Sequence, residues 1–227
     1  MHLSQIRQVI KILRRETRKF ELPSVSQIAM PRKDRPFDEA QDRPFRVLIS
    51  CLLSLRTKDE VTYPASERLF GRAEDMKSMA RMDPKEIEKI IYPVGFYRNK
   101  ARQIPEICRR LLREFGGKVP DEIDELLKLK GVGRKTANLV RTVGYGKPGI
   151  CVDTHVHRIS NRFGLVKTRN PHDTEFRLRK ILPQKFWIDY NDLLVTWGQN
   201  ICKPVSPLCS KCGVEKYCAK VGVGTRR

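Results

Sequence analysis

The chain has 227 residues, of which 40% are hydrophobic and 32% charged. This length suits one or two globular domains, and the absence of any run of about 18 apolar residues predicts no membrane-spanning segment. The formal net charge is +20. A compact chain this basic usually binds a polyanion, with DNA or RNA leading, although a generally basic proteome or an association with ribosomes would give the same charge.

The chain in order predicts a series of helices. A first helix over 3–20 carries a core face made by Ile6, Val9, Ile10 and Leu13. Residues 23–44 are polar and contain four prolines, which predicts a loop or linker. Residues 45–55 are almost all apolar and predict a buried helix. Thr57 with Glu60 then resembles a capping box that starts the next helix.

Helix-start and helix-stop residues define the middle of the chain. Asp83-Pro84 opens one helix, with Glu86 at its third position. The helix predicted over 97–115 ends at Gly116-Gly117, and a helix over 121–130 follows. No segment alternates apolar and polar residues convincingly, so the prediction is an all-α protein.

Residues 126–153 form the most informative stretch. Gly131 lies where a left-handed residue would end a helix, and 134–143 has the apolar spacing of a second helix. A turn this tight leaves backbone amides unbonded at the positive end of a helix, which can bind a phosphate. An ordinary αα-hairpin within a helical core explains the same pattern, so the hairpin alone leaves both readings open.

Lys135 favours a functional reading of this hairpin. It is predicted in the first turn of the second helix, beside Arg134, and both features disfavour the charged ammonium. A neutral lysine amine is the form that amine catalysis requires. Asp153 follows about one helix later. It is most simply the N-cap of a helix over 154–163, and a carboxylate near a nucleophilic amine also suits imine chemistry at a sugar carbon.

The C-terminal part predicts two more helices and a cysteine cluster. Asn170-Pro171 opens one helix, and the last helix spans about 185–200. Cys51, Cys108 and Cys151 lie in apolar surroundings and are predicted core residues. The remaining cysteines follow the pattern Cys-x6-Cys-x2-Cys-x5-Cys at positions Cys202, Cys209, Cys212 and Cys218.

Four thiolates on one short loop can ligate either zinc or an iron–sulfur cluster. The single Cys-x2-Cys knuckle with long arms favours the wider 4Fe–4S cluster. The uneven cysteine total and its clustering indicate metal ligation in a reducing compartment rather than a disulfide framework. We therefore expect a cytoplasmic protein, associated with the nucleoid in a prokaryote.

At this point the motifs resemble a known family. The sequence LKGVGRKTANLV followed by VDTHVHR is similar to the helix-hairpin-helix and Gly/Pro-Asp loop of the endonuclease III family of DNA glycosylases, over about residues 40–218. The resemblance implies a six-helix barrel with the hairpin at about 121–145 in a domain over 38–147. A second helical domain of 1–37 and 148–227 would carry an iron–sulfur loop at 202–218. A hinge near 144–149 would bring Lys135 and Asp153 together at a cleft.

The resemblance also assigns roles to residues. Lys135 would attack the sugar with help from Asp153, and the four cysteines would hold a 4Fe–4S cluster. The hairpin contact to DNA would come from Gly131, Gly133, Arg134 and Lys130, where Lys130 replaces the usual proline. Arg56 would fill the gap left by a flipped nucleotide, unless it is a solvated arginine. Phe96 would be a wedge in the base stack, unless it is a core aromatic. Lys203 is the one charged residue between the first two cysteines, and we expect it to face phosphates.

The expected function is excision of oxidised or damaged pyrimidines from double-stranded DNA, followed by strand cleavage at the abasic site, by a monomer with no membrane partner. A mismatch glycosylase acting on thymine, uracil or adenine is the alternative within the class. A non-enzymatic DNA-binding protein with a structural metal site is the alternative from another class. In that protein Lys135 would contact a phosphate and Asp153 would only cap a helix.

Overall fold

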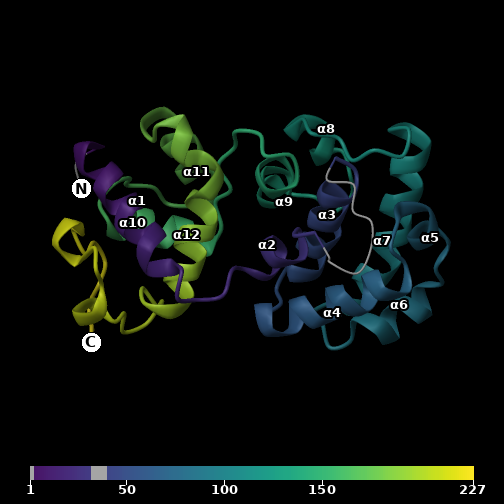
Figure 1. Ribbon diagram of the computed structural model, residues 1–227, viewed down its shortest axis with the longest axis horizontal. Coiled ribbons are helices and arrows are strands. Elements are labelled where there is room, and N and C mark those ends of the chain that lie inside the picture. The colour runs from purple at the N-terminus through teal and green to yellow at the C-terminus, as the bar shows by residue number, and fades with distance from the viewer. Residues whose placement is uncertain (1–2, 32–39) are drawn as a thin grey trace. The chain divides into compact units, whose positions relative to one another are not determined.

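The computed structural model describes residues 3–31 and 40–227. Every regular element of these residues is helical, so the all-α prediction is confirmed. The chain divides into two compact units (Figure 1). Unit 1 comprises Met1–Pro23 and Pro148–Arg227, and unit 2 comprises Ser24–Lys147. None of the described helices combines the length and apolar character needed to cross a membrane.

Unit 2 is arranged around α3 (Asp42–Ser54), which is buried on nearly all sides from Pro44 to Leu53. A helix that is apolar all round must lie in the centre of its domain. It packs against α2 (Ser24–Ile28), α4 (Asp59–Arg72), α7 (Tyr97–Glu114) and α9 (Arg134–Leu139). The unit also contains α5 (Met76–Arg81), α6 (Pro84–Ile91) and α8 (Ile123–Leu127), and α5 and α6 pack on α7.

The start of unit 2 differs from the prediction. Residues 23–44 were expected to form a loop, but α2 forms within them because it packs on both α3 and α4. The predicted domain boundary at 37/38 lies outside the described residues, whereas the structure assigns the stretch from Ser24 onward to unit 2. Short apolar residues in a proline-rich stretch gave no periodic signal for this helix.

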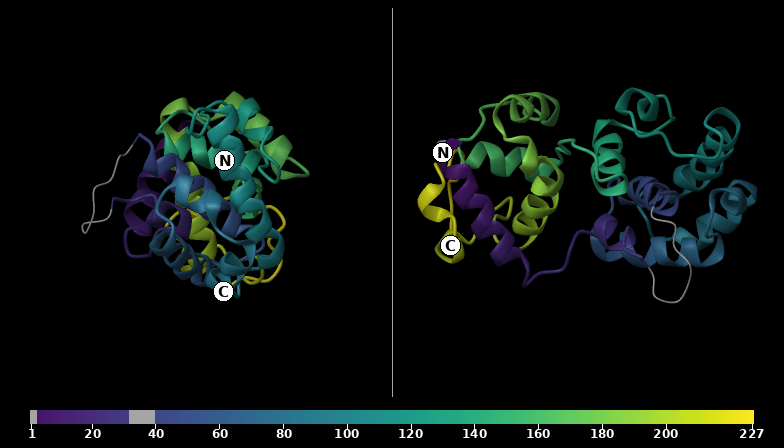
Figure 2. Two further views of the ribbon diagram at one scale, coloured as in Figure 1. Left: turned by 90° about the vertical axis from the view of Figure 1, so that its right-hand side faces the viewer. Right: turned by 45° about the horizontal axis from the view of Figure 1, so that its top comes forward.

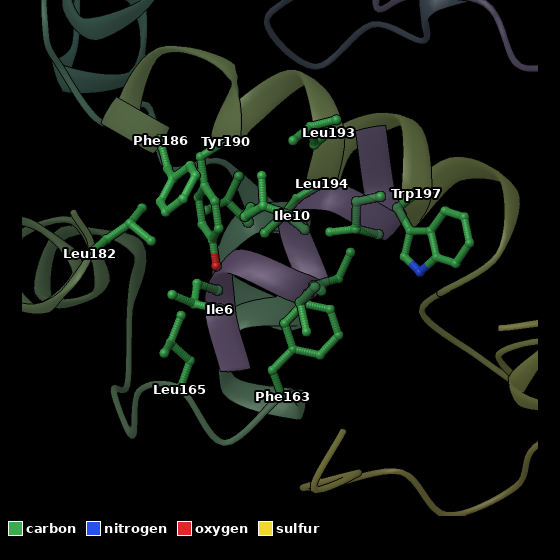
Figure 3. Packing of buried hydrophobic residues seen from close by; sticks show 14 of the residues in the cluster. Ile6, Ile10, Phe163, Leu165, Leu182, Phe186, Tyr190, Leu193, Leu194 and Trp197 are labelled. Atoms are coloured by element: carbon green, nitrogen blue, oxygen red, sulfur yellow. The ribbon is translucent and has the colours of Figure 1, made fainter. Parts of the chain in front are cut away.

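Unit 1 has its core between α1 (Leu3–Thr17), α10 (Thr154–Arg162), α11 (Pro171–Ile181) and α12 (Trp187–Asn200). The predicted stripe of α1 is confirmed, because Ile6, Val9, Ile10 and Leu13 are buried. Figure 3 shows Ile6 and Ile10 among Phe163, Tyr190, Leu194 and other core residues. The hydroxyl of Tyr190 reaches Ser160 Oγ at 3.0 Å, so this polar group is bonded within the core.

The C-terminal segment, residues 201–227, lies beside α1 in two views (Figures 1 and 2). A Cβ atom on Gly213 would lie 3.3 Å from Ile12 Cγ2, so a glycine permits this close approach. The segment contains two single 3₁₀ turns, at Cys209–Lys211 and Glu215–Tyr217. The cysteine-rich loop is therefore packed on the core of unit 1.

Several helix starts agree with the predicted capping residues. Asp83 accepts a hydrogen bond from the Lys85 amide, and Asn170 accepts one from the Asp173 amide. The predicted capping box at Thr57 is wrong: α4 begins at Asp59, and its N-cap Lys58 makes no side-chain cap. Thr57 Oγ1 instead accepts a hydrogen bond from the Gly95 amide, 38 positions further along the chain. The Thr57 hydroxyl therefore makes a tertiary contact to Gly95 in place of the local helix cap that was predicted.

Candidate functional site

The hairpin of unit 2 connects α8 to α9 and is held by α7. Gly131 has φ +80°, the left-handed conformation that the sequence predicted. Gln103 of α7 donates a hydrogen bond to the Lys130 carbonyl, and Arg110 Nη1 donates to the Lys128 carbonyl at 2.5 Å. A side chain at Gly131 would overlap the amide of Gln103. The turn is therefore fixed by its contacts with a neighbouring helix as well as by its glycine.

Both hairpin helices are shorter than predicted. The first is Ile123–Leu127 rather than 121–130, and the second is Arg134–Leu139 rather than 134–143. The second continues as a single π-helical turn, Val140–Gly144, which packs on α3. Gly144 permits a close approach there, since a Cβ on it would lie 3.0 Å from Pro44 Cα. Such π turns inside helices occur frequently at functional sites.

Lys135 lies in the first turn of α9 and is half-buried against α3. Beneath it is the thiol of Cys51, which is 1% exposed, as its predicted core role requires. Burial raises the pKa of Cys51 to about 12, and the charge of Lys135 opposes that rise. No pattern in the sequence indicates that Cys51 and Lys135 are neighbours. The helix that carries Lys135, α9, thus packs on the central helix α3.

Asp153 lies in unit 1, where it caps α10. Its Oδ1 accepts a hydrogen bond from the Val156 amide at 2.8 Å, which confirms the predicted N-cap. The side chain is half-buried, and its second oxygen has no hydrogen-bond partner within residues 3–31 and 40–227. One oxygen thus fixes the carboxylate, while the other remains available as an acceptor.

Arg56 and Phe96 occupy two neighbouring loops of unit 2. Both are exposed, and the Arg56 guanidinium lies 5.3 Å from the centre of the Phe96 ring. Phe96 is 57% exposed, so the alternative that it is a core aromatic is wrong. Both residues have positive φ, 53° for Arg56 and 57° for Phe96. Such a conformation costs a non-glycine residue about 1–3 kcal/mol and clusters at functional sites.

The four C-terminal cysteines line one pocket of unit 1 (Cys202, Cys209, Cys212 and Cys218). Burial raises the pKa of Cys212 to about 11 and also raises that of Cys218. Four sulfur donors on one short loop suit an iron–sulfur cluster, and a bound cationic group would offset the cost of burying thiolates. Among the described residues, no group of three or more Cys, His, Asp or Glu side chains is arranged to hold a single metal ion.

Two arginines of α10, which sequence reasoning missed, fasten this cysteine loop. Arg162 is 7% exposed, and its Nη1 donates to the Lys203 carbonyl at 2.7 Å and to Cys202 Sγ at 3.4 Å. Arg158 Nη2 donates to the Cys202 carbonyl at 2.8 Å. The Lys203 side chain itself is exposed. An alternation of basic and apolar residues in α10 looks like a solvated helix face, so only the packed structure reveals their role.

Comparisons with known proteins agree with this arrangement. Residues 49–184 match the family described as HhH-GPD superfamily base excision DNA repair protein. The endonuclease III of Thermotoga maritima is 50% identical over 183 residues, covering 81% of this chain and 86% of that protein. The endonuclease III of Synechocystis sp. is 39% identical, covering 77% of this chain and 80% of that protein.

A solved structure extends the likeness to the whole chain. The structure of a trapped endonuclease III–DNA covalent intermediate has a TM-score of 0.80 and 32% identity, covering 97% of both chains. The chain therefore belongs to the endonuclease III family within the HhH-GPD superfamily of base excision DNA repair proteins. Members of this family are DNA glycosylases with apurinic/apyrimidinic lyase activity.

The glycines of the hairpin give a matched test of its geometry. We expect Gly131→Ala to lower the free energy of unfolding by about 2 kcal/mol, because alanine is strained at positive φ and would displace Gln103. Gly133 has φ −97° and open space around it, so Gly133→Ala should change stability by less than about 1 kcal/mol. Denaturant unfolding measures both, and equal losses would contradict this account of the turn.

Proposed function

We propose that this protein excises oxidised or damaged pyrimidines from duplex DNA and then cleaves the strand at the abasic site, with Lys135 as the nucleophile. The observation that carries the proposal is the lysine in the first turn of the second hairpin helix, seated on α3, in a chain of the endonuclease III family. A base within a duplex is out of reach, so the target nucleotide must first be flipped out of the stack.

The chemistry follows from an amine attacking the sugar. Neutral Lys135 Nζ attacks C1′, the bond from C1′ to the base breaks, and the base leaves with the bonding electrons and takes up a proton. The nitrogen loses a proton, and its lone pair then displaces O4′ from C1′. As the sugar ring opens, O4′ takes up a proton, and a protonated imine is left between C1′ and Lys135. Loss of a proton from C2′ then expels the 3′ phosphate and breaks the strand. Water finally hydrolyses the imine and frees Lys135.

Asp153 supplies the acceptor that these steps need. Its second oxygen is free to take the proton from Lys135 or to stabilise positive charge that develops on the sugar. The hydrogen bond from the Val156 amide fixes the carboxylate during either step.

DNA contacts are assigned to two parts of unit 2. The hairpin residues Lys130, Gly131, Gly133 and Arg134 bind the phosphate backbone through amides and positive charge. Arg56 and Phe96 enter the duplex, Phe96 as an apolar wedge and Arg56 with a planar fork suited to base edges. Their exposure and mutual contact support this assignment.

The cysteine pocket is assigned to a 4Fe–4S cluster held by Cys202, Cys209, Cys212 and Cys218. A bound cluster would join the four cysteines of a loop whose regular structure is two single 3₁₀ turns and which Arg158 and Arg162 fasten to α10. Ordering this loop would hold the exposed Lys203 toward phosphates. A reducing compartment that contains DNA, the cytoplasm or a nucleoid, suits both the thiols and the substrate.

Borohydride trapping tests the nucleophile directly. We expect the protein to form a covalent complex with duplex DNA that carries an abasic site or an oxidised thymine when reductant is added, because the reductant fixes the imine. Lys135→Ala should lose the complex and retain binding. Lys128→Ala is the matched control: this hairpin lysine pairs with Glu125, and its variant should still be trapped.

The absence of a trapped band would contradict the lysine mechanism. Base release without trapping would then indicate a glycosylase that uses water, such as a mismatch enzyme acting on thymine, uracil or adenine. Binding without base release would indicate a DNA-binding protein. In that protein Lys135→Ala would mainly weaken binding and flatten its salt dependence.

Asp153→Asn separates catalysis from capping. Asparagine caps helices about as well as aspartate, so the free energy of unfolding should change by less than about 0.5 kcal/mol. Base release under single-turnover conditions should slow by about 100-fold or more, because an amide cannot accept the proton. Loss of stability in proportion to loss of rate would leave Asp153 with a structural role alone.

The cluster assignment is tested by metal analysis of protein purified without oxygen. We expect roughly four iron atoms and four sulfides per chain and broad visible absorbance. Cys212→Ala should lose both, whereas Cys108→Ala, a buried cysteine of unit 2, should keep them. A colourless protein that contains one zinc ion would contradict the assignment.

A further inference from the structure

The ammonium of Lys100 is buried at the end of the central helix of unit 2. Lys100 is 5% exposed, and its Nζ donates to the Leu53 carbonyl at 2.8 Å and to the Leu55 carbonyl at 2.6 Å. The last carbonyls of a helix lack partners within the helix and carry the negative end of its dipole. Lys100 therefore caps the C-terminus of α3 with a positive charge that comes from another helix.

No carboxylate pairs with this ammonium in the part of the chain that the structure describes. Burial lowers the pKa of Lys100 to about 8. A buried ammonium more usually pairs with a carboxylate. The three oxygens that Nζ contacts instead belong to one short segment, residues 53–57. This segment contains the end of α3 and Arg56, and we call it the Arg56 loop.

The third contact joins this segment to the Phe96 loop. Thr57 Oγ1 lies 3.3 Å from Lys100 Nζ and accepts the Gly95 amide at 3.1 Å. A Cβ atom on Gly95 would lie 2.4 Å from the Arg56 carbonyl oxygen, so the two loops pack backbone against backbone. The Lys100 amide also donates to the Phe96 carbonyl at 3.1 Å, which places Lys100 one helical turn after Phe96.

These contacts surround Arg56 and Phe96, which both have positive φ. Arg56 lies between Leu55 and Thr57, which both contact Lys100 Nζ, and Phe96 follows Gly95 directly. A left-handed non-glycine residue persists only where its surroundings over-determine its conformation. Lys100 Nζ thus bonds both the Leu55 carbonyl, next to Arg56, and the hydroxyl of Thr57, which holds the Gly95 amide.

We propose that Lys100 is a positioning residue that locks the Arg56 and Phe96 loops into a single rigid insertion element. This inference rests on the proposed function, since it assumes that Arg56 and Phe96 enter duplex DNA. Lys100 itself touches neither DNA nor the reacting atoms. It acts by fixing the backbone from which the two inserted side chains project, and a rigid wedge loses less freedom on entering the base stack than a mobile one.

The first experiment needs no DNA and no activity. Lys100→Met keeps the length of the side chain and removes the three contacts. Hydrogen exchange in the free protein should speed up by about tenfold or more in both 53–58 and 92–97, because amides exchange through local opening. Arg109→Met is the control. This residue lies on the opposite side of α7 and donates to the Ala80 carbonyl at 3.0 Å, so faster exchange should be confined to α5.

The second experiment measures what the rigid element does. We expect Lys100→Met to slow single-turnover excision from duplex DNA by about 100-fold, as misplaced contact groups do. Cleavage at an abasic site in single-stranded DNA should change by less than about threefold, because no base stack has to be opened there. In a protein that already carries Arg56→Ala and Phe96→Ala, adding Lys100→Met should slow duplex excision little further, because no inserted side chain is left to position.

Each outcome decides between the proposals. Equal losses on duplex and single-stranded DNA, or a full Lys100→Met effect in the Arg56→Ala, Phe96→Ala background, would overturn the positioning role while leaving the enzyme assignment intact. Unchanged exchange in either loop would also overturn it. A wild-type protein without trapping or excision would overturn the proposed function, and with it the insertion role of the loops, whatever the exchange result.

Thr57→Val provides an independent variant in case Lys100→Met folds poorly. Valine matches threonine in shape and removes the hydroxyl, which accepts from Lys100 and from the Gly95 amide and donates to the Leu55 carbonyl at 3.2 Å. We expect the same selective loss on duplex DNA, smaller than that of Lys100→Met, with the single-stranded reaction retained. A Thr57→Val protein with normal duplex excision and normal exchange in 92–97 would contradict the connection between the loops.

Discussion

Hydrogen bonds from one face of α7 to backbone carbonyls hold the hairpin and the Arg56 loop of unit 2 in place. Lys100 donates to the end of α3, and Gln103 and Arg110 donate to the hairpin carbonyls of Lys130 and Lys128. These three positions share one side of a helix, because each step of about 3.6 residues returns to the same face. The Arg56 loop and the hairpin are therefore both bonded to one helix, and a site built on a rigid helix is placed more precisely than one on free loops.

The same constraint explains where the glycines fall. Gly95 and Gly131 both lie where a Cβ would overlap a neighbour, the Arg56 carbonyl in one case and the Gln103 amide in the other. Gly133 has no such neighbour. The two glycines of the GlyValGly turn are therefore present for different structural reasons. One is required by a left-handed backbone packed against α7, whereas the other leaves space around the backbone at the start of α9.

Much of the fold could be predicted from the sequence, because local signals agree with it. The all-α class, the apolar stripe of α1 and the caps at Asp83, Asp153 and Asn170 depend on neighbouring residues alone. Tertiary contacts overrode the local signal elsewhere. Thr57 has the spacing of a capping residue, yet its hydroxyl bonds the Gly95 amide, and α2 forms in a proline-rich stretch because α3 and α4 cover it.

The candidate site divides in the same way. Lys135, Asp153 and the cysteines stood out because their residue types and spacing are chemically unusual. Lys100 and Arg162 did not, since a basic residue within an amphipathic helix normally marks its solvated face. Their partners are backbone carbonyls, which every residue has, so no sequence pattern could show that these cations are buried.

Contacts to the backbone also separate the support of the insertion loops from the identity of the inserted residues. Lys100, Thr57 and Gly95 bond or pack against main-chain atoms of residues 53–57 and 95, so the Arg56 and Phe96 side chains carry none of that support. Their own contact is a single cation–π pair at 5.3 Å, worth about 0.5–1 kcal/mol when exposed. Other side chains could replace Arg56 or Phe96 without breaking the backbone contacts that support the two loops. If Arg56 enters the duplex as proposed, the identity of this side chain can therefore change the preference for the opposite base while the backbone that supports it stays the same.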